Sequence, residues 1–204
     1  WEYARGQSTW FAELSGVYTA TGGDDASGLT IGEDDSDQAN TEQAHMGWRY
    51  DDPLAGLEED TFSLSVGRQD YLIGTGLLIA DGGSDGGEDG GWYLAMRKAF
   101  QETVVASLRS NRLVAEGFFL KNRPRRGGVQ GDAAGANLEY TFSGGLTTGL
   151  TYMVVDARLP DTEDLDVWSG RLGWNGLGGL ELNGEYVLED SRQIDADGWY
   201  GEIG

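Results

Sequence analysis

The side chains of this chain that could do chemistry are its carboxylates, its arginines and one histidine. The sequence holds 35 Asp and Glu, 14 Lys and Arg, and a single histidine, His45. A Ser-His-Asp triad would need that histidine, and no Gly-x-Ser-x-Gly elbow accompanies it. The absence of cysteine excludes thiolate metal sites, disulfides and cysteine nucleophiles. The carboxylates are too numerous for any pair to indicate acid–base catalysis, and we predict that the protein is not an enzyme.

The net charge of −21 bears on the class of partner. Nucleic-acid binding needs basic patches that neutralise phosphates, so no nucleic-acid partner is predicted. The same charge is compatible with cation binding, with a saline habitat or simply with solubility.

Much of the negative charge lies in segments that glycine and aspartate mark as loops. The long acidic loops are predicted near residues 22–42, 70–91, 122–134, 157–164 and 190–197. In the second loop a Ca²⁺ site could be formed by the oxygens of Asp81, Asp85, Glu88 and Asp89. Their spacing matches neither an EF-hand nor the nine-residue glycine–aspartate repeat of calcium-binding β-helices. The favoured interpretation of residues 81–91 is a mobile, solvated loop, with no cofactor and with Ca²⁺ as the alternative.

The segments between these loops alternate apolar and polar residues, which is typical of β-strands. Within residues 178–189, Tyr186 and Leu188 fall on one face and Glu181 and Glu185 on the other, because successive side chains of a strand point to opposite sides. Strands are predicted at residues 10–21, 43–51, 61–69, 92–108, 112–121, 135–142, 145–156, 165–174, 178–189 and 198–204. The connections between them alternate long and short. No stretch approaches the roughly 18 consecutive apolar residues of a membrane helix, so any crossing would use strands.

These features predict an all-β fold, an antiparallel up-and-down transmembrane β-barrel without internal domain boundaries over residues 1–204. Lipid would face the apolar rows and water the charged rows. Tryptophan and tyrosine cluster near the predicted strand ends, where a membrane–water boundary would favour them. Residues 1–3 indicate the tail of an earlier strand before a turn at 5–8. Ten strands with two open edges would expose unpaired backbone to lipid, so we expect a larger barrel of about 14 to 18 strands.

The alternation also predicts which polar side chains face the lumen. The predicted pore-lining residues are Arg49, Arg97, Arg109, Glu139, Arg171, Glu181 and Glu185. Facing rows of arginine and glutamate would create a transverse field that orients polar solutes. The alternative is that these side chains only pair with each other and fill the wall. Lys98 and Glu102 break the pattern of their strand, which predicts a bulge or a boundary position there.

Four segments resemble the bacterial alginate-export family and related porin-type outer-membrane barrels. They are FSLSVGRQDY at residues 62–71, WYLAMR at 92–97, FFLKNRP at 118–124 and WYGEIG at 199–204. The resemblance implies a channel or porin in the outer membrane of a Gram-negative bacterium. Its partners would be outer-membrane lipid and a small hydrophilic solute, such as a sugar or an anionic oligosaccharide. Alginate exporters have an arginine-rich lumen, whereas inward carboxylates here are as plentiful as inward arginines.

Two other classes stay open at this point. One is a soluble or surface-exposed all-β module that binds carbohydrate or Ca²⁺, in which the apolar rows pack sheet on sheet. The other is a barrel with a structural role as a sheath around partner proteins. The sequence gives no indication of the oligomeric state.

Overall fold

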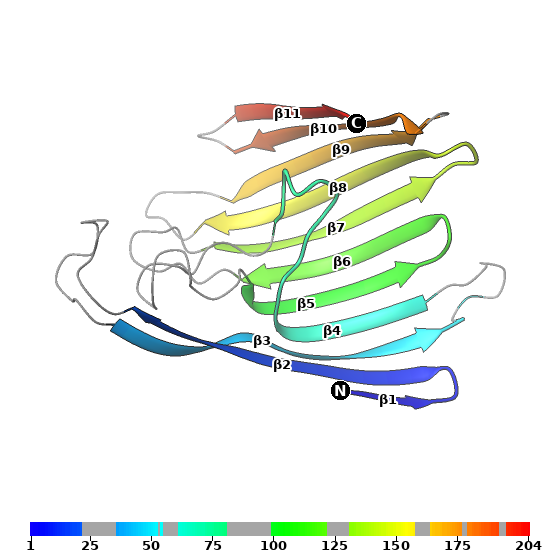
Figure 1. Cartoon of the computed structure of the whole chain (residues 1–204). Helices are drawn as coiled ribbons and strands as arrows, with labels where there is room; N and C mark the ends of the chain where they lie inside the picture. The colour runs from blue at the N-terminus through cyan, green and yellow to red at the C-terminus, as the bar shows by residue number, and fades with distance from the viewer. Residues whose placement is uncertain are drawn as a thin grey trace.

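The computed structural model describes residues 1–21, 36–52, 54, 61–80, 99–121, 131–157, 164–176, 179–191 and 195–204. These residues form one sheet of eleven antiparallel strands, and none of them is α-helical (Figure 1). The strands are β1 (Glu2–Arg5), β2 (Ser8–Thr21), β3 (Ser36–Asp51), β4 (Thr61–Gln69), β5 (Phe100–Arg109), β6 (Leu113–Lys121), β7 (Gly131–Thr141), β8 (Leu146–Ala157), β9 (Leu165–Asn175), β10 (Glu181–Asp190) and β11 (Asp195–Ile203). Each strand pairs with its neighbours in the chain, which confirms the predicted all-β, up-and-down topology.

The structure adds one strand to the ten that were predicted. Residues 2 and 3 of the predicted strand tail belong to β1, which pairs with β2 through a turn at Gly6, where φ is +63°. Glycine suits this position because it adopts a positive φ without the steric cost of a Cβ atom.

Five strands begin three or more residues away from their predicted starts. Two of them are β7 and β10, which begin at Gly131 and Glu181 instead of residues 135 and 178. β3 begins at Ser36, whereas the predicted strand began at residue 43. The prediction missed its first half, SDQANTE, because that sequence shows no alternation of apolar and polar residues. β11 begins at Asp195 instead of residue 198. β5 begins at Phe100, and residues 92–98 of the predicted strand lie outside the described residues.

The connections lie at two opposite ends of the strands (Figure 1). We call one of them the short-turn end. It holds the links β1–β2, β3–β4, β5–β6, β7–β8 and β9–β10. At the other, long-connection end, the links after β2, β4, β6 and β8 are each longer than the links before and after them. The last link, between β10 and β11, is short, so the predicted alternation holds as far as β9.

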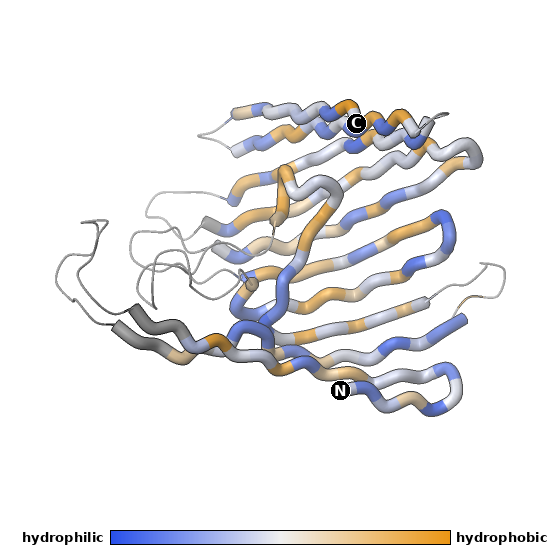
Figure 2. Tube along the Cα trace, viewed as in Figure 1, coloured by the Kyte–Doolittle hydropathy of each residue, from blue (hydrophilic) through white to orange (hydrophobic). Residues whose placement is uncertain are grey.

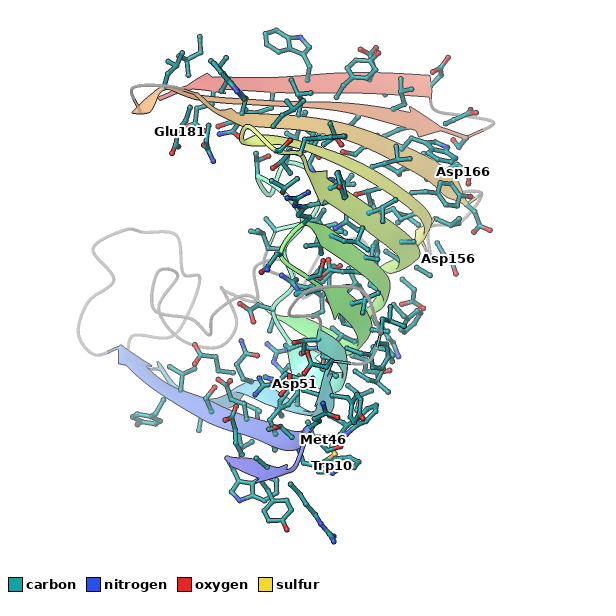
Figure 3. The ribbon with its side chains drawn as sticks, turned by 90° about the vertical axis from the view of Figure 1, so that its right-hand side faces the viewer. Trp10, Met46, Asp51, Asp156, Asp166 and Glu181 are labelled. Carbon is teal, nitrogen blue, oxygen red and sulfur yellow. The ribbon has the colours of Figure 1, made fainter. Side chains whose placement is uncertain are left out.

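The sheet is curved, so that it has a convex and a concave face. Viewed along the strands, Trp10, Met46, Asp156 and Asp166 lie on the convex side, and Asp51 and Glu181 on the concave side (Figure 3). Apolar and polar residues alternate along the strands in Figure 2 and therefore face opposite sides.

After β4 the chain folds back over the concave face of the sheet (Figure 1). We call residues 70–80 the inner segment. Its Ile73 and Ile79 are 1% and 6% exposed and belong to the apolar core. The other buried core residues are Val105, Phe118, Leu120, Met153, Val167 and Val187. Residues 70–80 belong to the long loop predicted over residues 70–91 and form none of the eleven strands, but their apolar side chains pack on the concave face. The predicted solvated loop at residues 81–91 lies outside the described residues.

Candidate functional site

The convex face carries large apolar side chains that are open to the surroundings. Leu138, Leu150 and Leu172 lie near one another on β7 to β9 and are 52%, 52% and 53% exposed. On β5 to β10 the charged convex-face residues are Glu102, Lys121, Asp132, Asp156, Asp166 and Asp190, and each lies at the long-connection end of its strand. The stretch between this charged rim and the short turns holds no charged residue on these strands, so it forms an apolar belt.

Aromatic residues line both borders of this belt. At the charged rim, the Tyr152 hydroxyl donates a hydrogen bond to Asp166 at 2.6 Å, and the Tyr186 hydroxyl donates one to Asp197 at 3.2 Å. At the short-turn end, the rings of Tyr140 and Phe142 are 4.8 Å apart. Trp48, Tyr50 and Phe62 form a second aromatic group at that end. Such rings favour a boundary between an apolar and a wet medium.

The concave face buries charged groups instead of exposing apolar ones. The first cluster surrounds Glu116 on β6, which is 7% exposed. Its carboxylate accepts hydrogen bonds from Ser107 at 3.2 Å, from Asn137 at 3.3 Å and from the Tyr71 hydroxyl at 3.0 Å. Arg109 forms an ion pair with the same carboxylate. These contacts replace the hydrogen bonds to water that the Glu116 carboxylate loses when it is buried.

The second cluster surrounds the Arg171 guanidinium on β9. Its side chain is 8% exposed and forms ion pairs with Glu139 at 2.9 Å and Glu185 at 3.8 Å. It also donates to Thr151 at 2.8 Å and to Asn137, which links it to the first cluster. The Arg171 and Glu116 clusters therefore form one hydrogen-bonded network across β5 to β10, which we call the concave network.

Two glycines leave room for the Arg171 guanidinium. Gly149 lies directly opposite Arg171 on β8, and a Cβ atom there would come within 2.8 Å of the guanidinium. Gly74 of the inner segment has a φ of +57°, and a Cβ atom there would overlap the Arg171 side chain. Side chains at these two positions would displace the arginine from its partners.

The inner segment makes polar contacts with both halves of the concave network. Tyr71 packs against Phe118, with ring centroids 5.3 Å apart, while its hydroxyl contacts Glu116. Thr75 donates to Glu185 at 2.9 Å. Burial raises the pKa of the Tyr71 hydroxyl, and the charge of the Glu116 carboxylate raises it further. Tyr71 therefore stays protonated as a hydrogen-bond donor.

The structure brings four of the seven predicted pore-lining residues into this network. They are Arg109, Glu139, Arg171 and Glu185. Arg49 lies apart from them and forms an ion pair with Asp51 at 3.8 Å. Glu181 lies on the concave side at the short-turn end (Figure 3). Arg97 lies outside the described residues.

Other predictions fall partly or wholly outside the described part of the chain. Asp81, Asp85, Glu88 and Asp89, the proposed Ca²⁺ ligands, are not among the described residues, nor is Lys98. Elsewhere in the described ranges no three His, Asp or Glu side chains are grouped as metal ligands. The pairing register of β4 with β5 shifts between Gly67 and Gln69, which is consistent with the predicted bulge near Glu102. Lys121 of β6 forms an ion pair with Glu102 at 2.9 Å.

Sequence reasoning missed Glu116, Tyr71 and Thr75 as parts of the site. A signal existed for Glu116, because it is the one carboxylate within the apolar run LVAEGFFL. The roles of Tyr71 and Thr75 depend on contacts with distant strands, which alternation within one segment does not reveal.

Comparison with protein-family models, with curated proteins and with solved structures finds no match to this chain. The resemblance to alginate-export barrels therefore stays a prediction from the sequence. Within the described residues, no helix is long and apolar enough to cross a membrane.

Proposed function

We propose that this chain forms the wall of a bacterial outer-membrane β-barrel that conducts a small hydrophilic solute. The observation that carries the proposal is the inverted distribution of charge. The convex face exposes an apolar belt, while the concave face buries Glu116, Arg171 and Glu185. A water-soluble protein rarely exposes contiguous apolar patches beyond a few hundred Å². A barrel wall needs this arrangement because lipid lies outside it and water inside.

The strand lengths support a membrane crossing. β4 to β10 have between 9 and 12 residues each. A tilted strand crosses the hydrocarbon core with about 9 to 11 residues. The charged rim beside the aromatic residues would then lie at one membrane surface, and the Trp48 group at the other.

In this proposal the sheet is one part of a closed wall. Among the described strands, β1 pairs only with β2 and β11 only with β10. Unpaired backbone groups in lipid cost several kcal/mol each, so both edges need partners in a membrane. Additional strands that pair with β1 and β11 would close the larger barrel that the sequence predicts.

The inner segment and the concave network give the lumen its proposed character. The inner segment occupies part of the concave side and would narrow the pore beside Glu116 and Glu185. Arg109 and Arg171, the two arginines of the network, form ion pairs with glutamates. Their charge is therefore neutralised, and binding of a strongly anionic polymer is not favoured. We therefore favour a neutral or cationic hydrophilic solute, such as a sugar, over alginate.

Two measurements on the native protein test the proposal. We expect it in the detergent-extracted envelope fraction, with gel migration that changes on boiling. Addition to planar lipid bilayers should produce discrete conductance steps. Recovery as a soluble monomer without detergent would contradict the membrane location. A folded envelope protein without conductance would favour a structural barrel instead.

A further inference from the structure

The described structure contains a cavity of about 300 Å³ between the inner segment and the concave face. Its lining comes from five elements of the chain. These are the inner segment with Leu78 and Ile79, β5 with Phe100, β6 with Leu120, and the strands β7 and β8. Because β5 and β7 begin here and β6 and β8 end nearby, the cavity lies near the long-connection end.

The cavity wall is apolar, unlike the concave network closer to the short turns. Ile79, Leu120 and Met153 are 6%, 1% and 6% exposed, so they form a closed apolar floor. Phe100 and Val155 also line it and pack against the core. In the proposed barrel the concave face is turned toward water, so the apolar side chains of this cavity would not contact lipid. Its wall is suited to binding an apolar group that reaches it from water.

The size and the apolar wall of the cavity define the class of molecule. A cavity of about 150 Å³ lined by apolar residues can bind benzene, and this cavity has about 300 Å³. A molecule with one substituted ring or two fused rings therefore fits. Asp132, the one ionisable residue among the described lining residues, has its side chain on the convex face with that of Ala134, so the wall that faces the cavity is apolar. An apolar wall favours a neutral molecule over a charged one, because a buried charge without a partner costs free energy.

We propose that this cavity binds a small neutral aromatic molecule at the long-connection mouth of the pore. Its place at a pore mouth rests on the proposed function, and the bound molecule would carry a hydrophilic part beside its aromatic group. The apolar group would bind against Leu120 and Met153, and the polar part would face the concave network.

Fluorine NMR on the full chain in detergent micelles tests the cavity directly. The probes are a fluoroindole, fluorobenzylamine and fluorobenzoate, which are neutral, cationic and anionic. We expect the fluoroindole signal to shift and broaden on addition of the protein, beyond the change that micelles alone produce. Fluorobenzylamine and fluorobenzoate should each bind at least about tenfold more weakly, because the apolar wall offers their charge no partner.

A pair of neighbouring alanines supplies the matched control. Ala133 lines the cavity, whereas Ala134 is exposed on the convex face. Ala133→Leu should fill part of the cavity and weaken fluoroindole binding about tenfold or more. Ala134→Leu adds the same atoms outside it and should leave binding unchanged. Migration that still changes on boiling verifies that both variants fold.

The possible outcomes separate this inference from the proposed function. Equal binding to wild type and Ala133→Leu would show partition into micelles and overturn the site. Equal binding of fluorobenzoate and fluoroindole would overturn the assigned charge class. Conductance without probe binding would overturn the cavity site alone. Specific binding without conductance would overturn the pore and support the cavity.

Discussion

Thr75 of the inner segment donates a hydrogen bond to Glu185 of β10, a residue 110 positions further along the chain. Together with the contact between Tyr71 and Glu116, this bond attaches the inner segment to the concave network at two points. The two carboxylates that carry buried charge on this face therefore also hold the segment that covers it.

Removal of the Thr75 hydroxyl should weaken this attachment. Thr75→Val keeps the shape of the side chain and should cost about 1.5 to 3 kcal/mol, the usual contribution of a hydrogen bond to a charged group. Hydrogen exchange of the Ile73 and Gly76 amides, which are bonded within the inner segment, should become faster. Thr148→Val on the convex face is the control. Unchanged protection in Thr75→Val would show that apolar packing alone holds the segment.

The raised pKa of Tyr71 predicts a pH dependence of inner-segment docking. An undocked tyrosine ionises near pH 10, whereas docked Tyr71 keeps its proton at that pH. Docking is therefore fully favourable below about pH 10 and loses up to about 1.4 kcal/mol per pH unit above it.

A difference absorbance titration between wild type and Tyr71→Phe measures this ionisation. We expect no phenolate signal from Tyr71 near pH 10 while the protein is folded. A Tyr71 phenolate that forms at that pH in the folded protein would contradict the buried contact with Glu116.

Loss of the Arg171 charge should destabilise the sheet. Arg171→Met leaves the fully buried Glu185 carboxylate without its ion pair and should cost about 3 to 5 kcal/mol. The double variant Arg171→Met/Glu185→Gln should recover part of this loss, because no unpaired charge stays buried. Arg112→Met in an exposed turn is the control. Urea unfolding midpoints give the comparison, and equal midpoints for both single variants would argue against a structural role for the network.

The apolar belt on the convex face gives the clearest distinction between lipid and water. Leu150→Arg should destabilise a membrane-embedded barrel by about 2 to 4 kcal/mol, whereas Asp156→Arg at the rim should cost about 0 to 1 kcal/mol. In a water-soluble protein, both changes would alter stability by only about 0.5 kcal/mol. Unfolding from lipid vesicles measures the difference. A stable Leu150→Arg variant in vesicles would contradict contact between the belt and lipid.

The sequence predicted the strands and their faces well where alternation was strong. Glu185 and Val187 are buried while Tyr186 and Leu188 are exposed, as the pattern within residues 178–189 indicates. The reason is local, because a period of two fixes the relative direction of neighbouring side chains. The first half of β3 was missed because it is polar on both faces and forms a strand through pairing with β2.

The inner segment could not be placed from local patterns. Its residues YLIGTGLLIA contain apolar side chains, but four glycine, threonine and alanine positions interrupt any strand alternation. Docking of the inner segment depends on Phe118, Glu116 and Glu185, which lie on strands further along the sequence. Apolar residues in a segment otherwise marked as a loop were the available signal that it packs against the sheet.

The contact between the inner segment and a strand far along the sequence affects the order in which the protein folds. Thr75 follows β4 in the chain, whereas its hydrogen-bond partner Glu185 lies on β10. The bond therefore forms only after six further strands, β5 to β10, have paired. Contacts of such long sequence separation form late, because the entropy of closing the intervening loop must be overcome first. The sheet would thus assemble with its concave side open, and the covering of that side would be a final event of maturation.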